Sequence, residues 1–123
     1  LNELDQLNVQ RVVNLWTKRD PDLALAYGDW YVHLPISDGS KLPTDMRFWQ
    51  EVDNVADLIE KGVGVLIQCH AGRNRSSFFV ALVIREILGC SGAAAARLVQ
   101  ERRPNALANK AFSAYLERLP KLL

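Results

Sequence analysis

The stretch Gln68-Cys69-His70-Ala71-Gly72-Arg73-Asn74-Arg75-Ser76 follows one apolar run, Val63 to Ile67, and leads into another that ends at Ile84. An apolar run that opens into a short glycine-containing loop, and is followed by a second apolar run, is typical of a strand, a tight loop and a helix. Such a loop directs backbone N–H groups and a helix N-terminus at one point, which becomes an anion site. A thiol placed there ionises more readily and is therefore nucleophilic. The sequence thus predicts a reactive Cys69 in an anion-binding loop.

The rest of the chain is predicted to alternate between strands and helices. Runs rich in β-branched and aromatic residues predict strands over 11–16, 30–34 and 63–68. Caps, breakers and helical periodicity predict helices over 22–27, from Thr44 or Asp45 to Gly62, from Ser76 to Gly89, from Ser91 to Arg103, and from Asn109 to Leu119. Because strands separated by helices pair in parallel, we expect an α/β fold. Its central, mostly parallel sheet should have roughly three to five strands, flanked by helices on both faces.

Apolar spacing also predicts which helix faces are buried. The segment 76–84 is apolar on nearly all sides, which indicates a helix in the centre of the domain. In the helix before it, the inward face is expected to carry Phe48, Val52, Val55 and Ile59. In the last helix, the inward residues are expected to be Phe112, Tyr115, Leu116 and Leu119.

Length and composition fit one domain over residues 1–123 and exclude several classes of protein. Of the 123 residues, 49% are hydrophobic and 24% are charged, as in an ordinary globular domain, and the net charge is +1. A charge so close to zero gives no global attraction to nucleic acid. The sequence contains neither a signal-peptide pattern nor an apolar run of the roughly 18 residues that a membrane span requires. We therefore expect a cytoplasmic monomer that neither spans a membrane nor binds nucleic acid.

The cysteines and histidines are too few and too scattered for a metal site. Cys69 and Cys90 form no paired framework, which fits reduced thiols, and Cys90 is expected to pack at a helix end. His33 and His70 have no metal-ligand spacing to the cysteines, and His33 is expected to pack on its strand. We expect neither a metal nor another cofactor.

The residue types in the loop suit the transfer of a phosphoryl group. That reaction depends on positioning three equatorial oxygens, for which a ring of backbone N–H groups is well suited. Arg75 adds a planar fork of donors, Cys69 can attack phosphorus, and Ser76 can hydrogen-bond the thiolate as it leaves. The predicted phosphate-binding residues are His70, Ala71, Gly72, Arg73, Asn74 and Arg75.

A departing alkoxide or phenoxide needs a proton donor on a mobile loop. Asp38 lies in the loop from Pro35 to Pro43, which precedes the cysteine, and Gly39 beside it allows movement. Asp45 is the competing carboxylic acid, but it stands where the next helix should begin, and capping explains it. We therefore predict Asp38 as the proton donor.

The segment Cys69 to Arg75, followed by Ser76, is similar to the Cys-x5-Arg-Ser/Thr signature of the cysteine-based phosphatases. The upstream Leu34 to Asp38 resembles the dual-specificity branch, as do Arg103-Pro104 and 109–116 downstream. The resemblance extends from about Val9 to Leu119, with the family's N-terminal strands shortened or missing. It implies Cys69 as nucleophile, Arg75 as phosphate clamp, Asp38 as acid and then base, and Ser76 as helper. The implied enzyme is a phosphatase of phosphotyrosine and phosphoserine or phosphothreonine in proteins, working through a cysteinyl-phosphate intermediate.

Two alternatives stay open at the level of sequence. Basic residues at the first and fourth variable loop positions, His70 and Arg73, resemble phosphatases of phosphoinositides or other small or lipid phosphates. Gln68 stands where the family has histidine, so a phosphate-binding pseudophosphatase with weak or no turnover is the second alternative. In either case the predicted partner is a phosphorylated protein or a small phosphomonoester.

Overall fold

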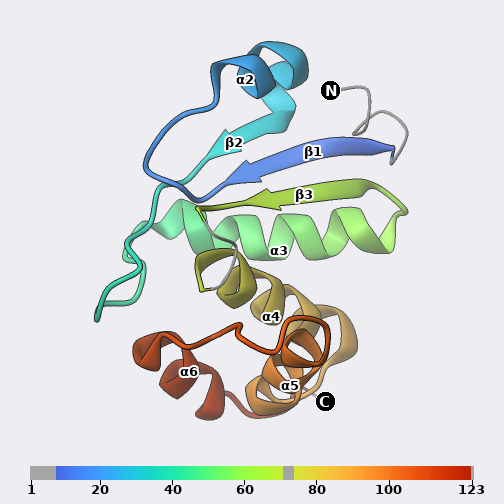
Figure 1. Cartoon of the computed structure of the whole chain (residues 1–123). Coiled ribbons are helices and arrows are strands. Elements are labelled where there is room, and N and C mark those ends of the chain that lie inside the picture. The colour runs from blue at the N-terminus through green and yellow to red at the C-terminus, as the bar shows by residue number, and fades with distance from the viewer. Residues whose placement is uncertain (1–7, 71–73, 123) are drawn as a thin grey trace.

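The computed structural model describes residues 8–70 and 74–122, and a parallel sheet lies at its centre (Figure 1). The strands are β1 (Val9–Asn14), β2 (Tyr31–His33) and β3 (Gly64–Gln68), arranged in the order β2-β1-β3. Both neighbours of β1 run parallel to it, with Val13 opposite Val32 on one side and Ile67 on the other. The described part of the sheet therefore has the predicted parallel pairing and the lower end of the predicted number of strands.

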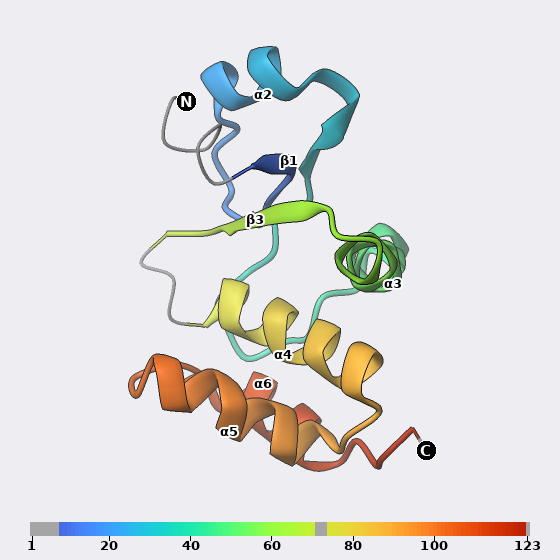
Figure 2. The ribbon, with the colours of Figure 1, turned by 90° about the vertical axis from the view of Figure 1, so that its right-hand side faces the viewer.

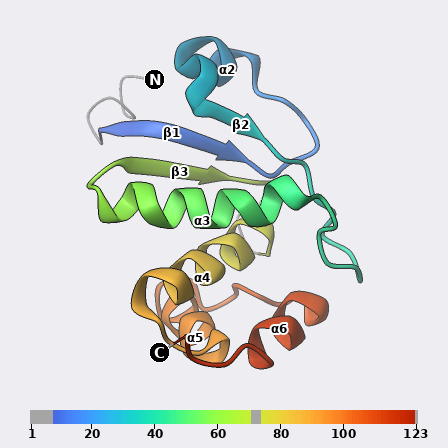
Figure 3. The ribbon, with the colours of Figure 1, turned by 180° about the vertical axis from the view of Figure 1, so that it is seen from behind.

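Helices cover both faces of this sheet, as predicted. They are α2 (Pro21–Tyr27), α3 (Met46–Glu60), α4 (Arg75–Leu88), α5 (Gly92–Arg102) and α6 (Lys110–Glu117), with a 3-10 turn at Gly28–Trp30. Side chains of adjacent strand residues point to opposite faces. Val12 accordingly packs against Leu23 of α2, whereas Val13 joins the larger core on the other face. Figure 3 shows α3 running alongside β3, and Figure 2 shows α4 between the sheet and the layer formed by α5 and α6.

Local sequence explains where the helices begin and end. Asp20, Asp45, Ser91 and Asn109 each accept a hydrogen bond from a backbone N–H group in the first turn of α2, α3, α5 and α6, respectively. At the end of α4, Gly89 has a φ of 68°, a left-handed conformation that favours glycine. The predicted boundaries of these elements are thus confirmed to within a few residues.

Two local predictions are wrong. Ile59 is 42% exposed although its spacing places it on the buried face of α3. The last two residues of this helix and the two that follow it, residues 59–62, are solvent-exposed, so helical periodicity continues beyond the packed core. Trp30, predicted to begin a strand, instead ends the 3-10 turn and is 46% exposed, while Tyr31 begins β2.

Stacked aromatic rings join helices α3, α4 and α6. Phe78 of α4 stacks on Phe112 of α6 with ring centroids 4.4 Å apart, and Phe48 of α3 lies 6.0 Å from Phe78 on a near-parallel plane. All three rings are fully buried. Because buried aromatic side chains contribute large contact areas, this stack fixes the start of α6 against the start of α4.

A buried ion pair joins β1 to α3. The guanidinium of Arg11 donates to both carboxylate oxygens of Glu51, at 2.9 and 2.7 Å, and the two side chains are only 16% and 5% exposed. We expect Glu51→Ala to lower the free energy of unfolding by about 3 kcal/mol, because a mostly buried guanidinium is left without its anion. Urea denaturation measures this change. Glu60→Ala removes an exposed glutamate from the same helix and should alter stability by less than about 0.5 kcal/mol; equal effects of the two substitutions would contradict the prediction.

Candidate active site

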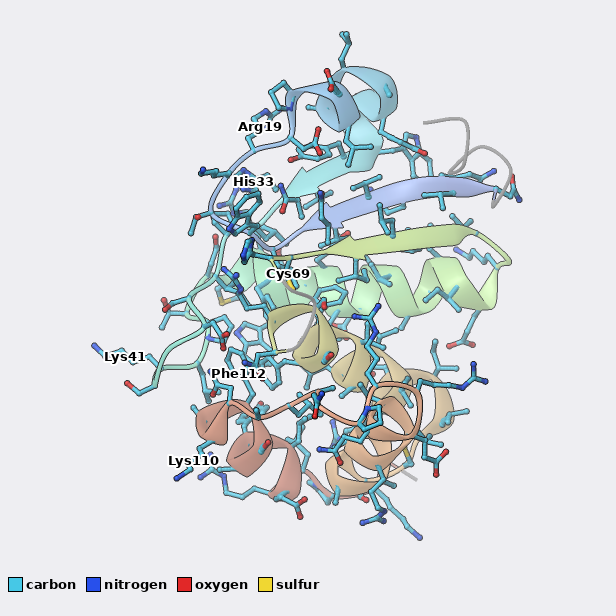
Figure 4. The ribbon with its side chains drawn as sticks, in the orientation of Figure 1. Arg19, His33, Lys41, Cys69, Lys110 and Phe112 are labelled. Atoms are coloured by element: carbon cyan, nitrogen blue, oxygen red, sulfur yellow. The ribbon has the colours of Figure 1, made fainter. Side chains whose placement is uncertain are left out.

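The predicted nucleophile lies at the carboxyl edge of the sheet. Cys69 follows the last residue of β3, and Figure 4 shows it at the same end of the strands as His33, the last residue of β2. Ligand sites of parallel α/β folds form at this edge, because loops from neighbouring strands meet there. The position of Cys69 is therefore one at which ligand sites form.

The thiol of Cys69 faces the first turn of α4. The backbone N–H of Ser76 donates to Sγ at 3.3 Å, and Cys69 is a free, half-buried cysteine. A helix N-terminus carries partial positive charge and unpaired N–H groups, both of which stabilise an anion. Ser76 is 7% exposed, and it contacts the sulfur through its backbone N–H group, whereas the sequence prediction left open which atom would do so.

Arg75 begins α4 and is half-buried at the same place. Its Nη1 lies 3.4 Å from the carbonyl oxygen of Ile36, in the loop that carries Asp38. An arginine fork has five N–H donors, so the one long contact that Arg75 makes with the described residues leaves capacity for a bidentate contact with an anion. The described structure thus brings Arg75 between the cysteine loop and the loop of residues 35–43, called the acid loop below.

Asp38 lies directly beside the cysteine loop. Its Oδ2 accepts a hydrogen bond from Nδ2 of Asn74 at 3.0 Å, and its Oδ1 accepts one from Nδ2 of Asn109 at 2.8 Å. Asn74 is the fifth residue after Cys69, so the predicted acid and the predicted nucleophile belong to adjoining segments. The carboxylate itself is exposed, which leaves it accessible to a substrate.

Asp45 has the helix-capping position predicted for it. Its Oδ1 accepts from the backbone N–H of Arg47 at 2.9 Å, and its Oδ2 accepts from the Arg47 guanidinium at 2.7 Å. The side-chain hydrogen bond from Arg47 lowers the pKa of Asp45. A carboxyl group held in its ionised form is a poor proton donor, so Asp45 is poorly suited to be the acid.

His70 contacts an aromatic side chain from another strand end. Its ring centroid lies 5.2 Å from that of Trp16, and Nε2 of His33 lies 2.7 Å from the carbonyl oxygen of Trp16. His33 is thus a packed and hydrogen-bonded residue, as predicted. The other predicted phosphate-binding residues of the loop, Ala71, Gly72 and Arg73, lie outside the described residues.

Gln68 lies behind the nucleophile with an incomplete set of hydrogen bonds. Its Nε2 is 3.5 Å from Oδ2 of Asp20, which is the limit for a hydrogen bond, and Asp20 caps α2 at the same time. Within the described part of the chain, the buried Oε1 atom of Gln68 has no hydrogen-bond partner. A buried acceptor without a donor is unfavourable. The long contact between Gln68 and Asp20 therefore holds β3 and the start of α2 together only weakly.

Sequence reasoning missed Asn109 as a residue of the site. Its position at the start of the last helix predicted a boundary, but nothing in the local sequence indicated that its amide group reaches Asp38, which lies 71 positions earlier. Residues 8–70 and 74–122 contain no cluster of histidine, cysteine and carboxylate side chains that could hold a metal ion. None of the helices formed by these residues is long and apolar enough to cross a membrane.

The amino-acid sequence is similar to those of known proteins. The sequence model of the family "Dual specificity phosphatase, catalytic domain" matches residues 1–120. Dual specificity protein phosphatase 15 of Homo sapiens is 23% identical over 115 residues, which cover 94% of this chain and 39% of that protein. The chain thus spans less than half the length of this curated relative.

Solved structures show the same fold at low sequence identity. The crystal structure of human DUSP28 is similar with a TM-score of 0.79 and 20% identity, covering 95% of this chain and 80% of that one. The crystal structure of human tyrosine phosphatase-like serine/threonine/tyrosine-interacting protein is similar with a TM-score of 0.71 and 22% identity, covering 95% and 80%. The central sheet and its helices are therefore arranged as in these proteins.

Proposed function

Because the chain belongs to the dual specificity phosphatase family, we propose that it hydrolyses phosphomonoesters through a cysteinyl-phosphate intermediate. The observation that carries the proposal is the meeting of three groups from separate segments. Sγ of Cys69 faces the N-terminus of α4, Arg75 begins that helix, and the amide of Asn74 joins the cysteine loop to the carboxylate of Asp38.

In the first step, the thiolate of Cys69 attacks phosphorus. A P–S bond forms as the bond from phosphorus to the ester oxygen breaks, and Asp38 gives its proton to the departing oxygen. The guanidinium of Arg75 and the N–H groups at the start of α4 stabilise the equatorial oxygens, where negative charge gathers in the transition state. This step leaves an alcohol or phenol as product and a phosphorylated Cys69.

In the second step, water hydrolyses the intermediate. The carboxylate of Asp38 takes a proton from water, the water oxygen bonds to phosphorus, and the P–S bond breaks to release inorganic phosphate. The thiolate leaves toward the backbone N–H of Ser76, which lies 3.3 Å from Sγ and stabilises the returning charge. No metal or cofactor takes part in either proposed step.

The proposed substrates are phosphotyrosine and phosphoserine or phosphothreonine residues of proteins, with residues 1–123 acting as one catalytic domain. The family supports this choice through its activity toward both kinds of side chain. The exposed basic side chain of His70, beside Trp16, would instead suit the additional negative charge of a small or lipid phosphate. Turnover of a phosphopeptide and of a phosphoinositide, compared at equal concentration, distinguishes these substrates.

The test of the proposal is the rate of thiol alkylation. Iodoacetamide reacts with thiolates, and a helix N-terminus stabilises a thiolate, so Cys69 should be alkylated faster than Cys90 at neutral pH and should be protected by inorganic phosphate. Cys90, a half-buried free cysteine beyond the end of α4, provides the internal reference. Hydrolysis of an aryl phosphate in the presence of EDTA completes the test. If Cys69 is alkylated no faster than Cys90 and no product forms, the proposal is wrong.

A phosphate-binding module without turnover is the second candidate, and the surroundings of Gln68 favour it. This residue directly precedes Cys69, and its buried Oε1 has no partner among the described atoms. The human tyrosine phosphatase-like serine/threonine/tyrosine-interacting protein has a similar fold and is named for an interaction. This candidate predicts that vanadate binds while Cys69 is alkylated no faster than Cys90 and no product forms.

A further inference from the structure

Asn109 makes more hydrogen bonds than its role as a helix cap requires. Its Oδ1 accepts from the backbone N–H of Phe112, at 3.1 Å, which caps α6. Serine, threonine or aspartate would provide that acceptor equally well. Its Nδ2 group makes two further bonds, to Oδ1 of Asp38 at 2.8 Å and to the carbonyl oxygen of Gly39 at 2.9 Å. The amide offers an acceptor to the helix and two donors to the acid loop at once, whereas a serine hydroxyl has one donor and a carboxylate has none.

The position of the acid loop depends on hydrogen bonds from other segments, because the side chains at its tip do not pack against the core. Ile36 is buried, but residues 37–41 are all exposed, so contacts with the core cannot fix the tip of the loop. The described hydrogen bonds to this tip come from Asn109 and from Nδ2 of Asn74. These bonds therefore determine where the carboxylate of Asp38 points.

Asn109 is itself fixed by the core and by the cysteine loop. Its backbone N–H donates to Oδ1 of Asn74 at 3.0 Å, which orients the second amide. Phe112, one turn further along α6, is fully buried and stacked on Phe78 of α4. The position of Asn109 is thus tied to the same helix whose N-terminus faces Cys69.

We propose that Asn109 is a positioning residue, which holds Asp38 where its proton can reach the leaving oxygen. This inference rests on the proposed phosphatase function. Asn109 does not touch the reacting atoms; it acts through Asp38, with Asn74 as the second amide of the pair. Loss of the Nδ2 donors leaves the nucleophile and the anion site intact and loosens only the acid loop.

The experiment uses Asn109→Ser, which keeps the cap of α6 and removes both Nδ2 bonds. Proton donation matters most when the leaving group is a poor one. We expect kcat to fall roughly 10-fold for an alkyl or phenyl phosphate, the loss of one charge-assisted hydrogen bond, and less than about 2-fold for an activated nitrophenyl phosphate, with little change in KM. Asn105→Ser, the same substitution at an exposed position in the preceding turn, should change neither rate.

A second variant and a double variant keep the test decisive. Asn109→Asp also keeps the cap but replaces the amide donors with a second acceptor, so it loses the same two bonds and should show at least the loss of Asn109→Ser on the poor substrate. In an Asp38→Asn background, Asn109→Ser should have almost no further effect, because the two residues act as a unit. Equal losses on both substrates, or losses that multiply in the double variant, would overturn the role of Asn109. Inactivity of the unsubstituted protein would instead contradict the proposed function itself.

Discussion

Cys69→Ser is expected to lower the turnover of an aryl phosphate on the order of 10⁴–10⁶-fold, the effect of removing a nucleophile from a concerted set of catalytic groups. A serine hydroxyl at this position stays protonated near neutral pH, so the anion-stabilising groups around it have no thiolate to act on. The backbone N–H of Ser76 and the fork of Arg75 are unchanged, and phosphate should therefore still bind. Initial rates with EDTA present measure the loss of turnover, and competition by inorganic phosphate or vanadate measures binding.

The same substitution at the other cysteine is the control. Cys90 is a half-buried free thiol that packs against the core beyond the end of α4, remote from the strand ends. Cys90→Ser should keep turnover within about 2-fold and change stability only modestly. Comparable activities of the two variants would show that the chemistry does not pass through Cys69.

Asp38→Asn is expected to have the second-largest effect on catalysis. An amide at this position cannot donate the proton that an alkoxide needs, so kcat for a poor leaving group should fall about 10²–10⁴-fold. An activated aryl phosphate needs little protonation and should lose far less. Rates for a series of phosphates with increasingly basic leaving groups measure the effect as a steeper dependence on leaving-group basicity.

Asp45→Asn is the matched control for this substitution. Asparagine caps helices about as well as aspartate, so α3 should keep its first turn, and any turnover of the unsubstituted protein should be retained. The lowered pKa of Asp45 beside Arg47 already argues against a proton-donating role. A large loss in Asp45→Asn, with a small one in Asp38→Asn, would reverse the assignment of the acid.

Sequence patterns predicted those features that depend on neighbours along the chain. The strand, loop and helix around Cys69 follow from two apolar runs, and the burial of residues 76–79 follows from the same pattern. The caps Asp45 and Ser91 depend on contacts two or three residues away. Local physical chemistry determines such features, so the sequence alone indicates them.

Contacts between distant segments escaped prediction. The bond from Asn109 to Asp38 and the weak contact from Gln68 to Asp20 join residues 71 and 48 positions apart. Their formation depends on how the sheet and the helix layer pack, which periodicity does not specify. The predicted burial of Ile59 is wrong for a related reason, since its helix extends past the core that would have buried it. The strand, loop and helix around Cys69 could therefore be predicted from the sequence, whereas the contact that holds Asp38 could not.

The distances along the chain between the site's partners also bear on the order in which the site forms during folding. The contact of Cys69 with Ser76 spans seven positions, so it can form together with the local strand-loop-helix unit. The hydrogen bond from Asn109 to Asp38 spans 71 positions, and it needs the last helix to dock before the acid loop is held. Closing so long a loop costs more conformational entropy than closing a short one, and non-local contacts form later as a rule. A refolding chain should therefore regain its affinity for phosphate before it regains full turnover.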